Sequence, residues 1–206
     1  MKAEELLDLA PVVPVVVLDD PDAAVPLARA LVAGGLPVIE VTLRTEGALA
    51  AIERIAAEVP DAVVGAGTIV QPEDAERSAR AGARFLVSPG CTGRLREAMT
   101  ATALPFLPGV SSASEAMALL EHGVTAMKFF PAEAAGGAPY LKALNGPLPQ
   151  IRFCPTGGVT QDNATRYLGL PNVGCVGGSW LTPADAVRDG DWDRIEDLAR
   201  KAAALR

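Results

Sequence analysis

The sequence has few of the residues from which metal centres and nucleic-acid surfaces are built. It holds one histidine, three scattered cysteines and no run of lysine or arginine, and its formal net charge is −7 over 206 residues. His122, with no cluster of cysteine or aspartate, gives a protein-held zinc ion too few ligands, so we expect no metal and no cofactor. An acidic chain without a basic patch is not expected to bind nucleic acid.

Long apolar runs and paired cysteines are absent as well. No apolar stretch reaches the length that spans a bilayer, and residues 1–5 begin an acidic amphipathic helix rather than a signal peptide. The cysteine pattern predicts a reducing, cytoplasmic environment without disulfides. Half of the residues are apolar and 21 % are charged, which is typical of a globular protein, and we expect residues 1–206 to form a single domain.

Strand-like and helix-like segments alternate along the chain. A short helix is expected at residues 4–9, and the following β-branched run is apolar on both faces, as in a parallel strand that is covered on both sides. Strands are expected at residues 11–18, 37–43, 62–67, 84–88, 104–110, 124–130, 150–155 and 172–177. Eight strand–helix units predict a (β/α)8 barrel, a TIM barrel with a short N-terminal helix; the alternative is an open doubly wound sheet.

A lysine and a glutamate occur inside apolar strand-like runs. Lys128 is one of four lysines and is flanked by Met127 and Phe129, while Glu40 follows Ile39 in the second strand. A buried ammonium tends to lose its proton, and the neutral amine is a nucleophile that can attack a carbonyl. A nearby carboxylate can move the protons that Schiff-base chemistry requires. The alternatives are a lysine that reaches out of a strand end and a buried salt bridge.

Glycines and small polar residues follow the expected strands on the side where barrel active sites lie. Gly157 and Gly158 follow the seventh strand, and Gly178 and Ser179 follow the eighth. Backbone N–H groups in such turns can hold a phosphate, although the same residues also suit ordinary tight turns. Arg44, just after the second strand, can bind a carboxylate by two parallel hydrogen bonds or lie on the surface.

Three further residues are given structural interpretations. His122 comes at the end of a predicted helix and is expected to interact with the helix dipole. Cys91 is interpreted as a small apolar filler. Trp180 and Trp192 are expected to pack helices.

Six short motifs, taken together, are specific. They are Glu-Val-Thr-Leu-Arg-Thr (40–45), Gly-Ala-Gly-Thr (65–68), Ser-Pro-Gly (88–90), Lys-Phe-Phe-Pro-Ala-Glu (128–133), Pro-Thr-Gly-Gly (155–158) and Gly-Gly-Ser-Trp (177–180). In this order, over about residues 11–183, the sequence resembles the 2-keto-3-deoxy-6-phosphogluconate (KDPG) aldolases, a family that includes 4-hydroxy-2-oxoglutarate aldolases. Cys91 departs from the family, which more often has an apolar residue there.

The resemblance implies roles for the residues. Lys128 would form the Schiff base, and Glu40 would shuttle protons through a water. The pyruvyl carboxylate would be held by Arg44 and Thr68, in a pocket shaped by Pro89 and Phe130. The phosphate would be held by Gly157, Gly158, Gly178 and Ser179. The family implies a metal-independent class I aldolase, usually a homotrimer, that cleaves KDPG to pyruvate and glyceraldehyde 3-phosphate.

Two functions from other classes remain open on the sequence. One is a barrel isomerase or epimerase that acts on a phosphorylated sugar without a covalent intermediate, in which Lys128 is electrostatic. The other is a non-catalytic sensor of a phosphorylated ligand, which would need neither Lys128 nor Glu40. The sequence leaves open how KDPG, its C4 epimer and 4-hydroxy-2-oxoglutarate compare as substrates.

Overall fold

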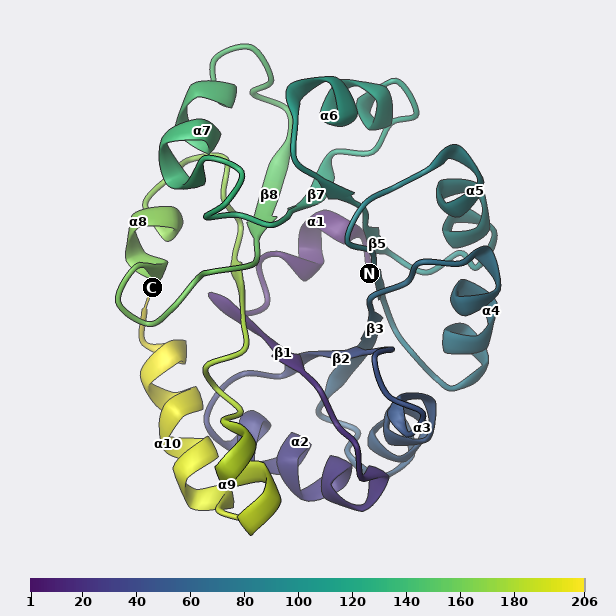
Figure 1. Ribbon diagram of the computed structural model, residues 1–206, viewed down its shortest axis with the longest axis vertical. Helices are drawn as coiled ribbons and strands as arrows, with labels where there is room; N and C mark the ends of the chain where they lie inside the picture. The colour runs from purple at the N-terminus through teal and green to yellow at the C-terminus, as the bar shows by residue number, and fades with distance from the viewer. Residues whose placement is uncertain (206) are drawn as a thin grey trace.

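Strands line the middle of the molecule and helices form its outer layer (Figure 1) in the computed structural model, which describes residues 1–205. The strands are β1 (Val12–Val16), β2 (Val38–Thr42), β3 (Val63–Gly67), β4 (Leu86–Val87), β5 (Phe106–Leu107), β6 (Gly109–Val110), β7 (Ala126–Phe129), β8 (Arg152–Pro155) and β9 (Val176–Gly178). The helices are α1 (Ala3–Leu6), the 3-10 turn η1 (Pro21–Ala23), α2 (Ala24–Ala33), α3 (Ala48–Glu58), α4 (Pro72–Arg80), α5 (Gly93–Ala101), α6 (Ala113–Leu120), α7 (Gly137–Leu144), α8 (Ala164–Leu168), α9 (Ala184–Asp189) and α10 (Trp192–Ala203).

The strands are parallel and form two hydrogen-bonded sheets that curve around a shared interior. One sheet has the order β5-β4-β3-β2-β1-β9 and the other has the order β6-β7-β8. An isolated parallel bridge joins Thr156, just after β8, to Gly177 in β9. The predicted parallel α/β architecture and short N-terminal helix are confirmed. The curved parallel arrangement expected of a (β/α)8 barrel is present, but its closure is not, because the ladders of residues 1–205 are divided between two sheets. Helices α2 to α10 lie outside the strands rather than on both faces, unlike a doubly wound sheet (Figure 1).

The strand predicted at residues 104–110 is divided at Pro108. Leu107 in β5 pairs with Val87, whereas Gly109 in β6 pairs with Lys128 in β7. Proline has no backbone N–H and cannot donate to a ladder. The Pro108 carbonyl still accepts a hydrogen bond from the Lys128 N–H at 3.0 Å. This one segment therefore supplies the last strand of one sheet and the first strand of the other.

Some helix boundaries differ from the sequence prediction. The sequence predicts that Thr45 caps the third helix, but its hydroxyl donates to the Leu18 carbonyl and α3 begins at Ala48. The sequence also predicts no helix between residue 177 and Asp191, where α9 forms. By contrast, the sequence predicts that Ser112 and Glu115 form a capping box. This prediction is confirmed, because Ser112 Oγ accepts the Glu115 N–H at 3.3 Å and Glu115 Oε2 accepts the Ser112 N–H at 2.9 Å.

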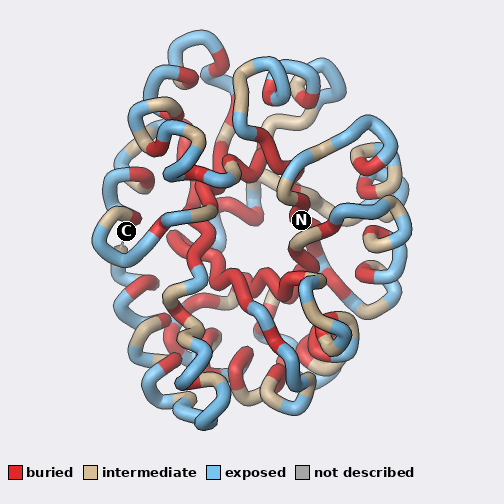
Figure 2. The backbone as a smooth tube through the Cα atoms, viewed as in Figure 1, coloured by how far each residue is buried: buried red, intermediate tan, exposed pale blue. Residues whose placement is uncertain are grey.

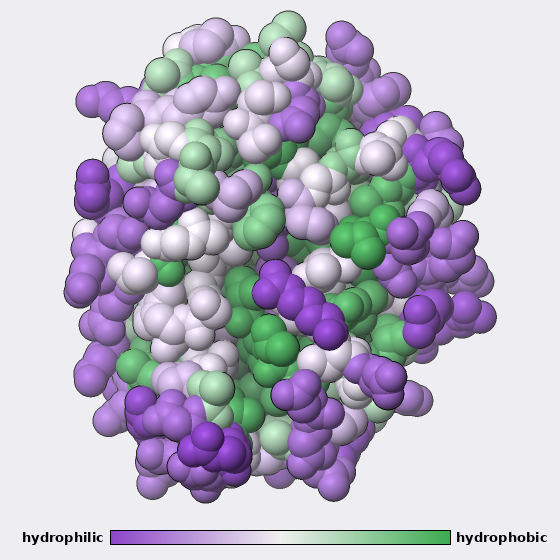
Figure 3. All heavy atoms as spheres, in the orientation of Figure 1, coloured by the Kyte–Doolittle hydropathy of each residue, from purple (hydrophilic) through white to green (hydrophobic). Residues whose placement is uncertain are grey.

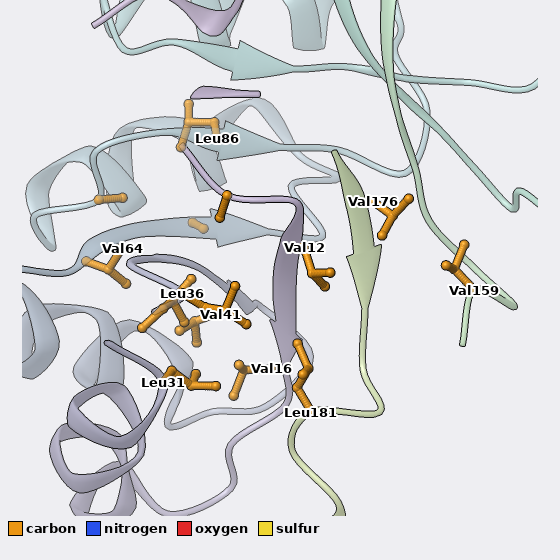
Figure 4. Close-up of a cluster of buried hydrophobic side chains, with 14 of the residues drawn as sticks. Val12, Val16, Leu31, Leu36, Val41, Val64, Leu86, Val159, Val176 and Leu181 are labelled. Carbon is orange, nitrogen blue, oxygen red and sulfur yellow. The ribbon is translucent and has the colours of Figure 1, made fainter. Parts of the chain in front are cut away.

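The largest apolar cluster lies between the strands and the surrounding helices. Buried segments follow the inner ring of the chain, and the exposed segments lie on the outside of the helices and at the turns (Figure 2). Figure 4 shows Leu31 of α2 close to Val16, and Leu36 close to Val41, all of which are buried. Burial of β-branched strand residues on both faces explains why the strands read as continuous apolar runs in the sequence.

A second apolar cluster fills the interior at the amino ends of the strands. Leu6 and Leu7 of the N-terminal segment are buried there with Val13, Phe85 and Cys175. The same end carries a half-exposed ion pair between Arg152 at the start of β8 and Asp8. The short N-terminal helix thus contributes core packing at the end of the strands opposite to the residues described next.

Candidate active site

The buried lysine and glutamate lie together inside the ring of strands. Lys128 Nζ is 3.1 Å from Glu40 Oε1, and the two residues are 4 % and 3 % exposed. They come from β7 and β2, which belong to different sheets. Desolvation of such a pair can cost more than its attraction returns, so stability alone does not explain its presence. The predicted proximity of the two residues is confirmed, and the alternative of a lysine reaching out of a strand end is wrong.

Two glycine residues in the neighbouring strand make room for buried side chains, one of which is the glutamate. A Cβ atom at Gly67 would lie 2.1 Å from Glu40 Oε1, and one at Gly65 would lie 2.4 Å from the Phe85 ring. Gly65 is the β3 partner of Glu40. Gly67 therefore permits the Glu40 carboxylate to be packed inside the strands, while Gly65 makes room for the Phe85 ring.

An aromatic ring lies near the lysine, and a proline backbone lies near its strand partner. Lys128 Nζ lies 5.4 Å from the centre of the Phe130 ring, within the range of a cation–π contact. A Cβ atom at Gly109, the β6 partner of Lys128, would lie 2.3 Å from the backbone of Pro89. Both residues predicted to shape the pocket are thus next to Lys128 or to its strand partner.

The predicted carboxylate-binding residues touch each other. Arg44 Nε donates to Thr68 Oγ1 at 3.2 Å, and Arg44 is exposed. None of the ion pairs found among residues 1–205 includes Arg44. Thr68 has a φ of 60°, in the left-handed region that non-glycine residues seldom adopt. Such strain is most often kept at functional positions, and here it places a hydroxyl against a guanidinium whose charge is not neutralised by a protein carboxylate.

The two glycine-rich turns are adjacent. The bridge between Thr156 and Gly177 brings the turn after β8 beside the end of β9. Gly157 and Gly158 have φ values of 97° and 79°, which suit glycine rather than other residues. Within residues 1–205, the N–H groups of Gly157, Gly158 and Ser179 donate to no protein acceptor. Clustered unpaired N–H groups are what an anion site requires.

An open cavity lies beside the second turn. It has a volume of about 480 Å³ and is lined by Ser179, Val15, Leu18, Asp19 and Arg188, among others. On the face drawn in Figure 3, apolar side chains gather around the middle, a strongly hydrophilic side chain lies across them, and other hydrophilic side chains cover the rim. The Trp180 ring lies against β9, because a Cβ atom at Gly178 would lie 1.8 Å from it. Gly178 thus accommodates the indole and does not itself offer an open surface.

The cysteine and the histidine take the structural places expected of them. Burial raises the pKa of Cys91 to about 11, so the thiol stays protonated and unreactive near neutral pH. His122 is exposed and lies just after α6, near the helix C-terminus. None of the three cysteines is in a disulfide bond. No group of three or more metal-ligating side chains occurs in residues 1–205, and no helix in that range could cross a membrane.

Sequence reasoning missed three residues that support the first glycine turn. The Glu133 N–H donates to the Gly157 carbonyl at 3.0 Å, and Glu133 Oε1 accepts the hydroxyl of Tyr167. Asn163 Nδ2 donates to the Gly158 carbonyl at 3.0 Å. Glu133 ends one of the six motifs, and Tyr167 is one of only two tyrosines. Glu133 and Tyr167 are 34 positions apart in the sequence. No local sequence pattern indicates that two residues so far apart will be in contact.

Fold and site together define a class of protein: a parallel α/β enzyme with a lysine–carboxylate pair inside the ring of strands. The chain belongs to the KDPG and KHG aldolase family, whose model matches residues 3–198. The 2-dehydro-3-deoxy-phosphogluconate aldolase of Pseudoalteromonas atlantica is 52 % identical over 99 % of this chain and 95 % of its own. The KHG/KDPG aldolase of Escherichia coli K12 is 53 % identical over 97 % of this chain and 94 % of its own.

A solved structure from the same family matches in shape. The KDPG aldolase of Legionella pneumophila is 45 % identical, with a TM-score of 0.97, and covers 99 % of each chain. Its structure holds pyruvate captured at low pH as a covalent carbinolamine intermediate. These relatives are aldolases by name, and they confirm the resemblance that the six motifs predict.

Proposed function

We propose that this protein is a class I aldolase that reversibly cleaves KDPG to pyruvate and glyceraldehyde 3-phosphate. The observation that carries the proposal is the buried contact between Lys128 Nζ and Glu40 Oε1 in a chain of this family. The covalent carbinolamine in the Legionella relative supports the same chemistry.

Catalysis begins with the Lys128 amine. Glu40 lies within hydrogen-bond distance and accepts a proton from the ammonium, which leaves a neutral nucleophile. The amine adds to the C2 ketone to give a carbinolamine. Loss of water, with a proton supplied by Glu40 directly or through a water, gives an iminium ion. The positive nitrogen then draws electrons from the neighbouring carbon–carbon bond.

Cleavage and release follow from the iminium ion. The C4 hydroxyl loses its proton, the C3–C4 bond breaks, and the electron pair moves into the C2–C3 bond to form an enamine. Glyceraldehyde 3-phosphate leaves. The enamine takes a proton at C3, and water hydrolyses the resulting imine to pyruvate and free Lys128. Glu40 is the nearest carboxylate able to pass these protons in turn.

Two groups of residues near the Lys128–Glu40 pair bind the two charged ends of the substrate. Arg44 and Thr68 hold the pyruvyl carboxylate, with Phe130 and the Pro89 backbone shaping the pocket. The unpaired N–H groups of Gly157, Gly158 and Ser179, with the Ser179 hydroxyl, hold the phosphate; Gly178 contributes backbone only, because its Cα faces Trp180. A hydrogen bond to a charged group contributes roughly 1.5–3 kcal/mol, so a few such donors give a strong preference for a phosphorylated substrate.

A second substrate is favoured by one observation. The Escherichia coli relative is named a KHG/KDPG aldolase, and 4-hydroxy-2-oxoglutarate presents the same 2-keto acid to Lys128. We therefore include its cleavage to pyruvate and glyoxylate as a secondary activity. An isomerase or a ligand sensor needs no amine–carboxylate pair of this kind, and neither is proposed.

The assembly and setting of the enzyme remain predictions. They comprise a closed (β/α)8 barrel, one domain over residues 1–206, a homotrimer, a cytoplasmic location and activity without a metal. Light scattering of the purified protein tests the homotrimer: the molar mass in solution should be three times that of one chain. Treatment with EDTA tests metal independence: the rate should be unchanged, and a loss that a divalent ion restores would contradict it.

The activity itself is tested by measuring pyruvate release. KDPG, its C4 epimer and 4-hydroxy-2-oxoglutarate are supplied separately to the purified protein. The expected result is rapid pyruvate release from KDPG and slower release from 4-hydroxy-2-oxoglutarate. Release from neither substrate would overturn the proposed function.

A further inference from the structure

Tyr167 and Glu133 form a hydrogen bond beside the first glycine turn that the reaction above does not use. Tyr167, in α8, is 1 % exposed, and its hydroxyl donates to Glu133 Oε1. Burial, followed by this hydrogen bond, raises the pKa of Tyr167, so the hydroxyl keeps its proton and remains a donor. The contact joins α8 to the segment that follows the strand of Lys128.

The side chain and the backbone of Glu133 both contact the glycine turn. A Cβ atom at Gly158 would lie 2.7 Å from Glu133 Cγ and 2.8 Å from its Cβ, so the methylene carbons of Glu133 lie directly against Gly158. The Glu133 N–H donates to the Gly157 carbonyl at 3.0 Å. Residue 133 is therefore the surface against which the turn is formed.

Holding a carbonyl also aims an N–H group. The peptide unit is planar and trans, so the Gly157 carbonyl and the Gly158 N–H point in opposite directions. When Glu133 fixes that carbonyl, the Gly158 N–H is directed to the other side, where it has no protein acceptor within residues 1–205. Asn163 fixes the Gly158 carbonyl in the same way at 3.0 Å, and the Thr160 N–H holds Asn163 Oδ1 at 2.8 Å.

We propose that the Tyr167–Glu133 pair is a positioning device that sets the preference for phosphorylated substrates. Tyr167 holds the Glu133 side chain against Gly158, and Glu133 in turn keeps the N–H groups of the turn aimed at the phosphate. Neither residue touches the reacting carbons. The inference rests on the proposed function, because it assigns the specificity of that same site.

The central test removes a single oxygen atom. Tyr167→Phe keeps the buried ring but loses the donor. The expected result is about a tenfold rise in KM for KDPG, equivalent to ~1.4 kcal/mol, with kcat within about twofold. The kcat/KM for 4-hydroxy-2-oxoglutarate, which has no phosphate, should stay within about twofold. Tyr140→Phe is the matched control, because the Tyr140 hydroxyl accepts the Ala113 N–H away from this turn; it should leave the substrate preference unchanged.

A double-mutant cycle shows whether the two residues act as one device. Glu133→Ala should show the same KDPG-selective defect, and adding Tyr167→Phe to it should change little further, because the contact is already lost. Glu133→Gln keeps the methylene carbons and an acceptor oxygen, so it should stay within about threefold of the unmodified protein.

The possible failures are distinguishable. If the unmodified protein cleaves neither substrate, the proposed function fails. If it cleaves both but Tyr167→Phe slows them equally, changes neither, or only lowers the melting temperature, the inference is wrong. Additive defects in Glu133→Ala and Tyr167→Phe would also overturn it, since two independent residues would then be responsible.

Discussion

The two ends of the parallel strands use buried groups in opposite ways. The carboxyl half of the interior holds the Lys128–Glu40 pair at 3.1 Å, with both residues almost fully buried. The amino end is filled by Leu6 and Leu7, and its ion pair, Arg152 with Asp8, remains partly exposed. Burial of charge is costly and burial of leucine is stabilising. The buried charges therefore lie at the end of the strands where the reaction requires them, and the stabilising apolar packing fills the opposite end.

The largest expected effect comes from removing the lysine. Lys128→Ala should lower the rate of KDPG cleavage by about 10⁴-fold or more, because loss of a covalent nucleophile removes the route through the iminium ion. The matched control is Lys142→Ala in α7, which should keep its activity within about twofold. Pyruvate release is the measurement. Substantial activity in Lys128→Ala would mean that the pair is structural and that the two ends do not differ in this way.

A smaller loss should follow from neutralising the glutamate. Glu40→Gln keeps the shape and an acceptor for Lys128, but the amide cannot take up a proton. Turnover should fall by about 10²-fold, while the melting temperature changes little. An unchanged turnover would show that another group moves the protons.

The proposed phosphate site lies at the carboxyl ends of the strands, as the Lys128–Glu40 pair does, but substitutions there should impair substrate binding rather than the chemical step. Ser179→Ala removes one hydroxyl from the proposed phosphate site, so kcat/KM for KDPG should fall about 10- to 150-fold, as expected for a hydrogen bond to a charged group. The value for 4-hydroxy-2-oxoglutarate should be nearly unaffected. Gly158→Val should impair KDPG cleavage more severely, because valine does not suit a φ of 79° and its Cβ atom would lie 2.7 Å from Glu133 Cγ, so the turn could not keep its shape. Equal slowing of both substrates would remove these turns from the phosphate site.

Substitutions in the apolar cluster at the amino ends of the strands should change the stability of the protein and hardly change its activity. Leu6 is 1 % exposed, so Leu6→Ala should lower the free energy of unfolding by about 2–5 kcal/mol. Leu9, 43 % exposed, is the control, and Leu9→Ala should change the free energy of unfolding much less. Denaturant titration gives both values. At a temperature where the variant is folded, kcat should stay within about twofold; a large fall in kcat would mean that the ends are coupled.

The sequence predicted the parts of the fold that depend on local pattern. Apolar runs and capping residues placed the strands, the short N-terminal helix and the start of α6, because burial on both faces and helix caps leave signals within a few positions. Pro108 was inside a run that looked continuous, and its missing N–H divides the strand. Thr45 looked like a helix cap, but a more distant acceptor, the Leu18 carbonyl, takes its hydroxyl.

Site residues were predictable where a charged residue occurs inside an apolar strand. Lys128 and Glu40 were conspicuous as charges in apolar strands, and the structure brings them together across 88 positions. The contact between Tyr167 and Glu133 was not predictable, because each residue is ordinary in its own segment. Such tertiary contacts depend on how helices pack over strands, which no local pattern in one sequence records.

The central claim is that Lys128 forms a covalent bond with the substrate ketone. Borohydride added with pyruvate should reduce the imine, attach a pyruvyl-derived group to the protein and stop turnover. Peptide mapping by mass spectrometry should then find the adduct on Lys128 in the unmodified protein and no adduct in Lys128→Ala. An adduct that maps to Lys142 or another lysine, or full activity after treatment with no adduct, would contradict the account.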